Sequence, residues 1–345
     1  MSILQSYEHG GDIYRNQVRL DFSVNTNPLG MPENVLSALR ENLGVCENYP
    51  DPRCESLCRA VARAEGVPES GVVCGAGAAD IIYRLVFSAK PKKALVCAPT
   101  FSEYERAVLI SGGQVKYHSL REEEGFALTE RIVEDITADM DMVFLCNPNN
   151  PTGKLTDTEL LRTVAEACLN RGAALVLDEC FLPFTRGESL KSLPQVAVLK
   201  AFTKFYSMAG LRLGYLLCGD TRIINSVRDH AQLWSVSAPA QIAGIAALET
   251  RGWAERTLEL VETERVRLTA RLRETGLRVF GSDANFLLLK SEGKPLYEPL
   301  LKRGILVRGC ANFMGLNEDY IRIAVKKREQ NEELIEEIGN IIRGE

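Results

Sequence analysis

The sequence has only three histidines, and its ten cysteines include no CxxC pair. Zinc sites usually take closely spaced ligands from these two residue types, so we predict no metal site. The chain also lacks an excess of positive charge, with 41 Lys and Arg against 46 Asp and Glu and a formal net charge of −5. This balance excludes a broad basic surface for nucleic acid or an anionic membrane.

Long hydrophobic runs are absent as well, and none reaches the length that spans a bilayer. The first 22 residues have neither the apolar core nor the cleavage site of a signal peptide. We therefore expect a cytoplasmic protein whose cysteines remain reduced thiols. The closest two, Cys54 and Cys58, have the spacing of one helix face.

Short apolar runs recur along the first 220 residues, separated by amphipathic stretches such as 156–172. Runs that are apolar on both faces and alternate with helical patterns are typical of a mostly parallel sheet covered by helices. The runs are VVC (72–74), ALVCA (94–98), MVFLC (142–146), AALVLD (173–178), VAVLKAF (196–202) and LRLGYLLC (211–218). They predict a large α/β domain.

A second, smaller α+β unit is predicted after a charged helical segment at 255–273. Its strands are expected in NFLLLK (285–290), GILVRG (304–309) and YIRIAV (320–325), with helices near 296–302 and in the final NEELIEEIGNIIR. With 345 residues, two domains are a reasonable expectation. We predict an N-terminal arm over 1–40, a large domain over 41–250 and a small domain over 251–345.

Two glycine- and proline-rich stretches follow predicted strands. CGAGAAD (74–80) precedes a helical pattern, and glycines at such a turn let backbone amides approach a phosphate. A plain tight turn is the alternative, because the dinucleotide and P-loop fingerprints are incomplete. CNPNNPTGKL (146–155) specifies a loop at the carboxyl end of a strand, where open parallel sheets bind ligands.

A third group combines Asp178, which ends the strand-like LVLDE, with Lys204 and Arg212. Lys204 lies in the apolar run AFTKFYSMAGLRLGY, and a desolvated lysine loses its proton easily and can form a Schiff base with an aldehyde. A buried aspartate can pair with a pyridinium nitrogen, and an arginine can grip a phosphate. Pyridoxal phosphate needs these three groups.

NPNNPTG, LDE and TKFYSMAGLRLGY together resemble the signature series of fold-type I pyridoxal-phosphate enzymes, in the branch that contains the histidinol-phosphate aminotransferases. The resemblance extends over nearly the whole chain. It implies an α/β transferase fold with a mostly parallel seven-stranded sheet in the large, cofactor-binding domain. It further implies that the N-terminal arm contributes to the small domain and to a lid over the active site.

The same resemblance assigns roles to individual residues. Lys204 is similar to the lysine that forms the Schiff base with the cofactor, Asp178 to the partner of the ring nitrogen, and Asn150 to a donor for the ring hydroxyl oxygen. Tyr49 resembles a tyrosine that reaches the cofactor of the neighbouring subunit, which implies a homodimer with shared active sites. The implied cofactor site comprises Gly77, Ala78, Ala79, Phe101, Asn150, Asp178, Thr203, Lys204, Arg212 and Tyr49.

Two positions depart from the aminotransferase pattern. Ala201 stands where many relatives carry a hydroxyl residue, so that phosphate contact is either absent or supplied by Thr203. Phe181 replaces a tyrosine and removes a donor to the ring oxygen.

Flanking motifs resemble the L-threonine O-3-phosphate decarboxylase family of cobalamin biosynthesis, which also accommodates Phe181. They are HGGD (9–12), DFSVNTNPLGMP (21–32), YPDP (49–52), LREEEGF (120–126), LWSVSAPA (233–240) and VRGCANFMGL (307–316). This family implies loss of CO2 from threonine phosphate to give (R)-1-amino-2-propanol O-2-phosphate. The implied substrate site comprises His9, Asn25, Gly30, Asn150, Arg308 and Arg322, with Arg322 on the carboxylate.

Two alternatives stay open at this stage. A histidinol-phosphate aminotransferase would share the cofactor site and a phosphorylated substrate. A non-catalytic ligand-binding module with this fold would have lost Lys204 or Asp178, and the sequence retains both.

Overall fold

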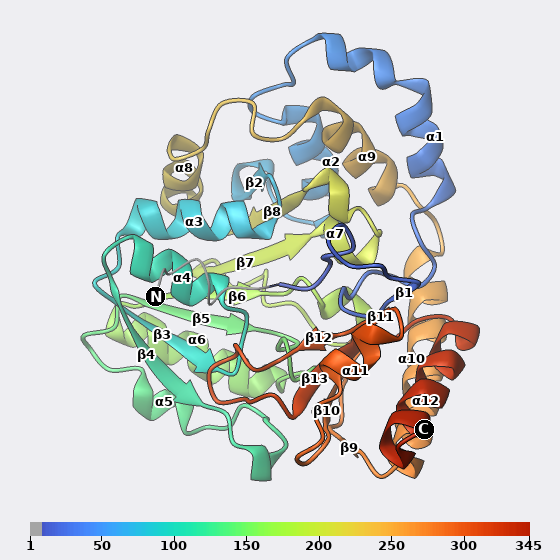
Figure 1. Cartoon of the computed structure of the whole chain (residues 1–345). Coiled ribbons are helices and arrows are strands. Elements are labelled where there is room, and N and C mark those ends of the chain that lie inside the picture. Colours follow the sequence, from blue (N-terminus) through green and yellow to red (C-terminus); the bar gives the residue numbers. More distant parts are fainter. Residues whose placement is uncertain (1–8) are drawn as a thin grey trace.

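The computed structural model describes residues 9–345, so the first eight residues of the predicted arm lie outside the described residues. Two units are visible, a large sheet with helices packed on it and a smaller unit that contains the C-terminus (Figure 1). Over the described residues, no helix combines the length and the apolar character needed to cross a membrane.

A seven-stranded sheet forms the centre of the large unit. In spatial order its strands are β2 (Val72–Gly75), β8 (Gly214–Leu217), β7 (Val196–Ala201), β6 (Ala174–Asp178), β5 (Met142–Cys146), β3 (Lys93–Ala98) and β4 (Gln114–Ser119). The pairs of β3, β4, β5, β6 and β7 are parallel, and β8 runs antiparallel to both of its neighbours. The predicted mostly parallel, seven-stranded α/β fold is confirmed.

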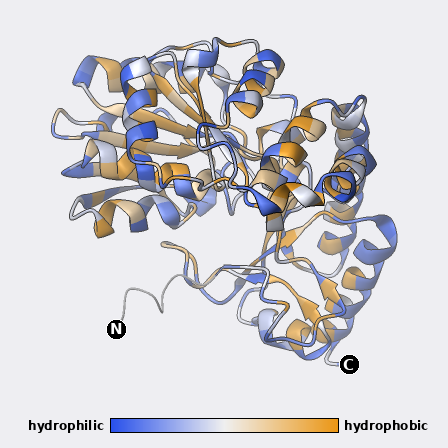
Figure 2. Ribbon diagram, turned by 90° about the horizontal axis from the view of Figure 1, so that it is seen from above, coloured by the Kyte–Doolittle hydropathy of each residue, from blue (hydrophilic) through white to orange (hydrophobic). Residues whose placement is uncertain are grey.

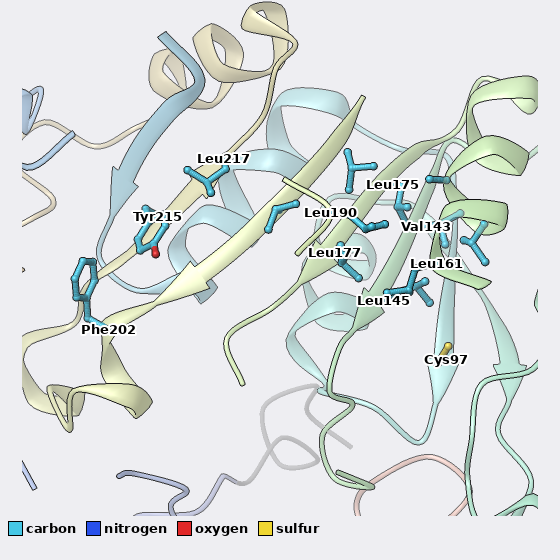
Figure 3. Close-up of a cluster of buried hydrophobic side chains, with 14 of the residues drawn as sticks. Cys97, Val143, Leu145, Leu161, Leu175, Leu177, Leu190, Phe202, Tyr215 and Leu217 are labelled. Atoms are coloured by element: carbon cyan, nitrogen blue, oxygen red, sulfur yellow. The ribbon is translucent and has the colours of Figure 1, made fainter. Parts of the chain in front are cut away.

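Alternate residues of the central strands enter two different hydrophobic clusters, because helices cover both faces of the sheet. Val143 and Leu145 pack into one cluster together with Leu161 of a covering helix, as Figure 3 shows. Met142 and Phe144 enter the cluster on the opposite face. Each such side chain contributes about 1.5–3 kcal/mol through its burial.

The helices of the large unit begin and end at recognisable signals. The Asp157 side chain accepts hydrogen bonds from two backbone amides at the start of α6, and Gly172, in the left-handed conformation, ends it. The helices are α1 (Glu33–Glu41), α2 (Glu55–Glu65), α3 (Ala78–Ala89), α4 (Glu103–Ile110), α5 (Ile132–Asp135), α6 (Thr158–Arg171), α7 (Phe202–Phe205), α8 (Thr221–Asp229) and α9 (Ala238–Leu248). The helical pattern predicted over 156–172 therefore corresponds to α6.

The smaller unit is an antiparallel sheet with its own apolar core. Its strands, in order, are β12 (Arg308–Gly309), β13 (Tyr320–Ala324), β10 (Phe286–Lys290) and β9 (Arg278–Val279), and its helices are α10 (Trp253–Glu274), α11 (Tyr297–Lys302) and α12 (Arg328–Arg343). Figure 2 shows apolar residues on the inner faces of these elements.

The predicted single strand over 304–309 is wrong. It divides into β11 (Ile305–Leu306), which pairs with the N-terminal strand β1 (Leu20–Asp21), and β12, which pairs with β13. Two successive partners require two short strands in place of one.

The N-terminal segment joins the two units. Its strand β1 is parallel to β11 of the smaller unit, and a few residues later the Asn27 amide donates to the carbonyl of Lys204 in α7 (2.9 Å). These contacts support a contribution of the arm to the small domain, while the domain boundaries remain a prediction.

Candidate active site

A cavity of about 460 Å³ lies where the carboxyl ends of β5, β6 and β7 meet the N-terminal segment and the smaller unit. Parallel strands present their carboxyl ends at one edge of a sheet, which is the usual ligand site of such folds. Most of the predicted site residues line this cavity, namely His9, Asn25, Ala78, Ala79, Phe101, Asn150, Asp178, Thr203, Lys204, Arg212, Arg308 and Arg322.

Lys204 lies in α7, directly after β7, and its amine is buried in the cavity. Burial, followed by the positive charge of Arg322, lowers the pKa of Lys204 to about 8. A substantial fraction of the amine is therefore neutral near physiological pH, and only the neutral form is a nucleophile.

Asp178 ends β6 and is 5% exposed. Its two carboxylate oxygens accept hydrogen bonds from the Tyr104 hydroxyl (2.6 Å) and the Cys180 backbone amide (2.9 Å). These donors hold the buried carboxylate in one orientation. Sequence reasoning missed Tyr104, although the residue lies only three positions after the predicted cofactor residue Phe101.

The N-terminus of α3 and the guanidinium of Arg212 form a cradle for an anion. Gly77 precedes the helix with φ +93°, and a Cβ at this position would lie 3.0 Å from a terminal nitrogen of Arg212. Gly214 is equally constrained, because a Cβ there would lie 2.7 Å from the Ala78 amide nitrogen. Backbone N–H groups and a fixed cation at one place are suited to a phosphate.

Arg322 of β13 extends into the cavity from the smaller unit. It donates to Oδ1 of Asn150 (2.6 Å) and to the carbonyl of Ser23 (2.5 Å). Its Nε is buried without a hydrogen-bond partner within residues 9–345. Burial and the neighbouring charge of Arg308 lower the pKa of Arg322 to about 10, so the group remains a cation and can bind a carboxylate.

Further polar groups line the cavity. Arg308 donates to Oδ1 of Asn312 (2.7 Å) and stacks over the Phe313 ring. Both side-chain polar atoms of Asn25 are buried without a hydrogen-bond partner in the described part of the chain. Because such groups are costly to leave unpaired, Asn25 fits a polar ligand in this cavity.

His9, predicted as a substrate residue, lies 2.8 Å from Oε1 of Glu103 and close to the Phe101 ring. Glu103 also accepts from the Tyr83 hydroxyl, and although burial opposes them, these hydrogen bonds hold the pKa of Glu103 below its ordinary value. The histidine thus lies at the cavity with an acidic partner that sequence reasoning missed.

Three predicted residues do not line the cavity. Gly77 packs against Arg212, and Gly30 lies in a turn with φ +84°. Tyr49 is 79% exposed and stacks on Trp234 at 4.5 Å. In this chain, Tyr49 therefore does not contribute to its own cavity.

The two departures from the aminotransferase pattern, Ala201 and Phe181, both line the cavity. Phe181 makes an edge contact with Phe286 at 4.9 Å and presents no hydrogen-bond donor. Thr203 lines the cavity beside Ala201 and carries a hydroxyl that a phosphate could accept from.

These groups fit pyridoxal phosphate. Within the described residues, the Lys204 amine forms no hydrogen bond or ion pair, and a buried amine without a partner is suited to a covalent bond with an aldehyde. Asp178 provides an anion for a ring nitrogen, and the cradle at α3 provides donors for a phosphate.

The comparisons with known proteins agree with this geometry. The family model of class I and II aminotransferases matches residues 18–338. The chain is 40% identical to a threonine-phosphate decarboxylase of Salmonella typhimurium, over 94% of this chain and 92% of that protein. It is 31% identical to an adenosylcobalamin biosynthesis bifunctional protein of Leptospira interrogans, over 98% of this chain and 41% of that protein.

A solved structure of similar sequence has the same fold over almost the whole chain. The histidinol-phosphate aminotransferase of Clostridium acetobutylicum superposes with a TM-score of 0.88 at 30% identity, covering 94% of this chain and all of that one. Fold and sequence agree over almost the entire length. The chain therefore belongs to the class I and II aminotransferase family and has the fold of fold-type I pyridoxal-phosphate enzymes.

Proposed function

We propose that this enzyme uses pyridoxal phosphate to decarboxylate L-threonine O-3-phosphate to (R)-1-amino-2-propanol O-2-phosphate and CO2. The observation that carries the proposal is one cavity lined by Lys204, whose lowered pKa favours the neutral amine, and by two arginines, Arg308 and Arg322, in addition to Arg212 at the anion cradle. Two arginines match a substrate with a carboxylate and a phosphate. The relatives from Salmonella and Leptospira support this reaction and a place in cobalamin biosynthesis.

The chain's own residues would divide the work as follows. Arg322 binds the substrate carboxylate, and Asn150, held by the same guanidinium, orients it. Arg308, Asn25 and His9, which line the cavity, would surround the substrate phosphate. When bound, pyridoxal phosphate supplies an electron-accepting ring that weakens whichever Cα bond stands perpendicular to it.

The remaining cavity residues would handle the protons of the reaction and bind the cofactor. Asp178, whose carboxylate accepts a hydrogen bond from Tyr104, would lie beside the ring nitrogen of the bound cofactor and keep a proton on it. The Lys204 amine is the group that would hold the proton to be delivered to the substrate Cα once CO2 has left. Arg212, the amides of Ala78 and Ala79 and the Thr203 hydroxyl would hold the cofactor phosphate, and Phe101 would pack on the ring.

The proposed assembly is a cytoplasmic homodimer with shared active sites. Exposed apolar side chains gather near the Tyr49–Trp234 stack, where Trp234 is 45% and Leu233 66% exposed. A patch of this kind on an otherwise charged surface favours an interface. Tyr49 would then reach the cofactor phosphate of the neighbouring subunit, which explains its distance from its own cavity.

A product assay tests the reaction. Purified enzyme with the cofactor and threonine phosphate is expected to release CO2 in step with formation of the aminopropanol phosphate. Serine phosphate lacks one methyl and is expected to react about 10- to 200-fold less efficiently. The proposal fails if no CO2 appears while histidinol phosphate transfers its amino group to 2-oxoglutarate, which is the activity of the aminotransferase alternative.

Substitution Arg308→Gln tests the substrate phosphate. Loss of a buried cation facing a dianion is expected to lower kcat/KM for threonine phosphate about 10²-fold. Turnover of unphosphorylated threonine should change little, so the ratio of the two values is the measurement. Arg278→Gln is the matched control, because Arg278 pairs with Glu122 away from the cavity. An equal loss with both substrates would assign Arg308 a structural role only.

A further inference from the structure

Two arginines of the active-site cavity lie opposite each other on neighbouring strands. Arg308 of β12 pairs with Arg322 of β13 in the antiparallel sheet of the smaller unit. Residues paired in this way have their Cβ atoms about 4.5–5.5 Å apart on the same face of the sheet. A substrate that contacts both guanidinium groups is therefore expected to carry its two anionic groups close together. An amino acid with a phosphate on its β-oxygen meets this condition.

A second cavity adjoins the active-site cavity. Its volume is about 360 Å³, which is large enough for a small ligand, and it lies between the end of β3, the start of α4 and the loop 311–316 that joins β12 to β13. Of the described residues, only Phe101, Ser102 and Phe313 line both cavities. Because Phe101 is proposed to pack on the cofactor, Phe313 is the residue that separates the second cavity from the part of the first beside Arg308.

Phe313 is held in place through its backbone and through its ring. Its amide donates to the Cys310 carbonyl, and its own carbonyl accepts from the Leu316 amide, both at 3.0 Å. The side chain is 7% exposed and packs in a hydrophobic cluster. The Arg308 guanidinium lies over the ring, 4.9 Å from its centre, in a cation–π contact. Phe313 therefore forms a fixed wall directly beside the guanidinium that is proposed to bind the substrate phosphate.

We propose that Phe313 is a specificity-determining residue, whose ring closes the phosphate end of the cavity and limits the substrate to amino acids that carry phosphate on the β-oxygen. The inference rests on the proposed function, which places the substrate phosphate at Arg308. A phosphate one methylene further from Cα would have to move past Arg308 toward the ring, and closely packed side chains do not yield to an added methylene without cost.

Homoserine phosphate is the matched probe, because it is an isomer of threonine phosphate that carries the phosphate on the γ-oxygen. The two compounds have the same atoms and the same charge, so they differ only in shape. The unmodified, cofactor-loaded enzyme is expected to decarboxylate homoserine phosphate about 10²-fold less efficiently than threonine phosphate, measured as the ratio of the two kcat/KM values.

Substitution Phe313→Ala removes the ring between the two cavities, so the ratio should fall at least about tenfold. The value of kcat/KM for homoserine phosphate should rise, whereas the value for threonine phosphate should fall severalfold, because Arg308 loses the ring on which it lies. Phe313→Leu keeps a buried apolar side chain and should give an intermediate ratio, which decides the question if Phe313→Ala folds poorly. Met314→Ala is the matched control, since Met314 follows in the same loop, is 54% exposed and lines only the second cavity. Its ratio should equal that of the unmodified enzyme.

Binding measurements separate this inference from the proposed reaction. The dissociation constants of both isomers are measured by calorimetry in a Lys204→Ala background, in which turnover is expected to stop. If the unmodified enzyme releases no CO2 but Phe313→Ala shifts the ratio of the dissociation constants at least about tenfold toward homoserine phosphate, the proposed function is wrong and the role of Phe313 stands. The role is refuted if neither Phe313 variant changes the kinetic or the binding ratio, or if Met314→Ala changes them as much as Phe313→Ala does.

Discussion

Replacing Lys204 with alanine is expected to lower kcat by at least about 10³-fold and to abolish the covalent attachment of cofactor that borohydride traps. The reason is local: the amine is buried, its pKa is lowered to about 8, and it occupies the cavity that contains Asp178 and the anion cradle. The fold should remain, because α7 keeps its backbone contacts with the N-terminal segment. Steady-state kinetics, mass spectrometry after reduction and circular dichroism are the measurements.

Lys204→Arg is the matched control, since it keeps the charge and length but cannot lose its proton. This variant should be as inactive as Lys204→Ala. If either variant turned over threonine phosphate with the kcat of the unmodified enzyme, the assignment of Lys204 would be wrong.

The lowered pKa also predicts a pH dependence of cofactor capture. Only the neutral amine attacks an aldehyde, so the rate at which cofactor-free enzyme takes up pyridoxal phosphate should rise with pH from 7 to 9 and level off above the pKa of about 8. An exposed lysine would show this rise about two units higher. Stopped-flow absorbance at several pH values measures the profile.

The sequence predicts those site residues that lie next to a strand recognisable from its apolar run. Asp178 and Lys204 each follow an apolar run, and parallel strands bring such positions to one edge of the sheet, so their proximity could be foreseen. The contacts of Arg322 with Asn150 and Ser23 could not, because they join three distant segments. The contact between His9 and Glu103 could not be predicted for the same reason, since 94 positions separate the two residues.

Two features of the strands could not be predicted from the sequence either. The strand β4 has a polar sequence, QVKYHS, because it lies at the edge of the sheet, so no apolar run indicated it. The segment 304–309 is divided into β11, which pairs with β1, and β12, which pairs with β13. A run of apolar residues does not indicate that the pairing partner changes within it. Both differences arise from tertiary pairing and not from residue propensity.

Asp178→Asn is expected to lower kcat about 10²- to 10³-fold while the enzyme still binds its cofactor covalently. An amide has nearly the same shape as the carboxylate, and its oxygen can still accept a hydrogen bond from Tyr104 or from the Cys180 amide. It lacks the negative charge that would hold a proton on the ring nitrogen of the bound cofactor, so the ring should accept electrons poorly.

Tyr104→Phe separates charge from orientation at the same carboxylate. The hydroxyl donates to Asp178 at 2.6 Å, and its removal leaves the charge in place but frees one oxygen. We expect a smaller loss of about tenfold in kcat, in line with one buried hydrogen bond to a charged group. The cofactor absorbance of Tyr104→Phe should titrate at a different pH, and that of Asp178→Asn should lose the protonated-ring form. If Asp178→Asn retained full activity and an unchanged spectrum, the carboxylate would not face the ring nitrogen, and the electron-accepting role of the cofactor would need another source of charge.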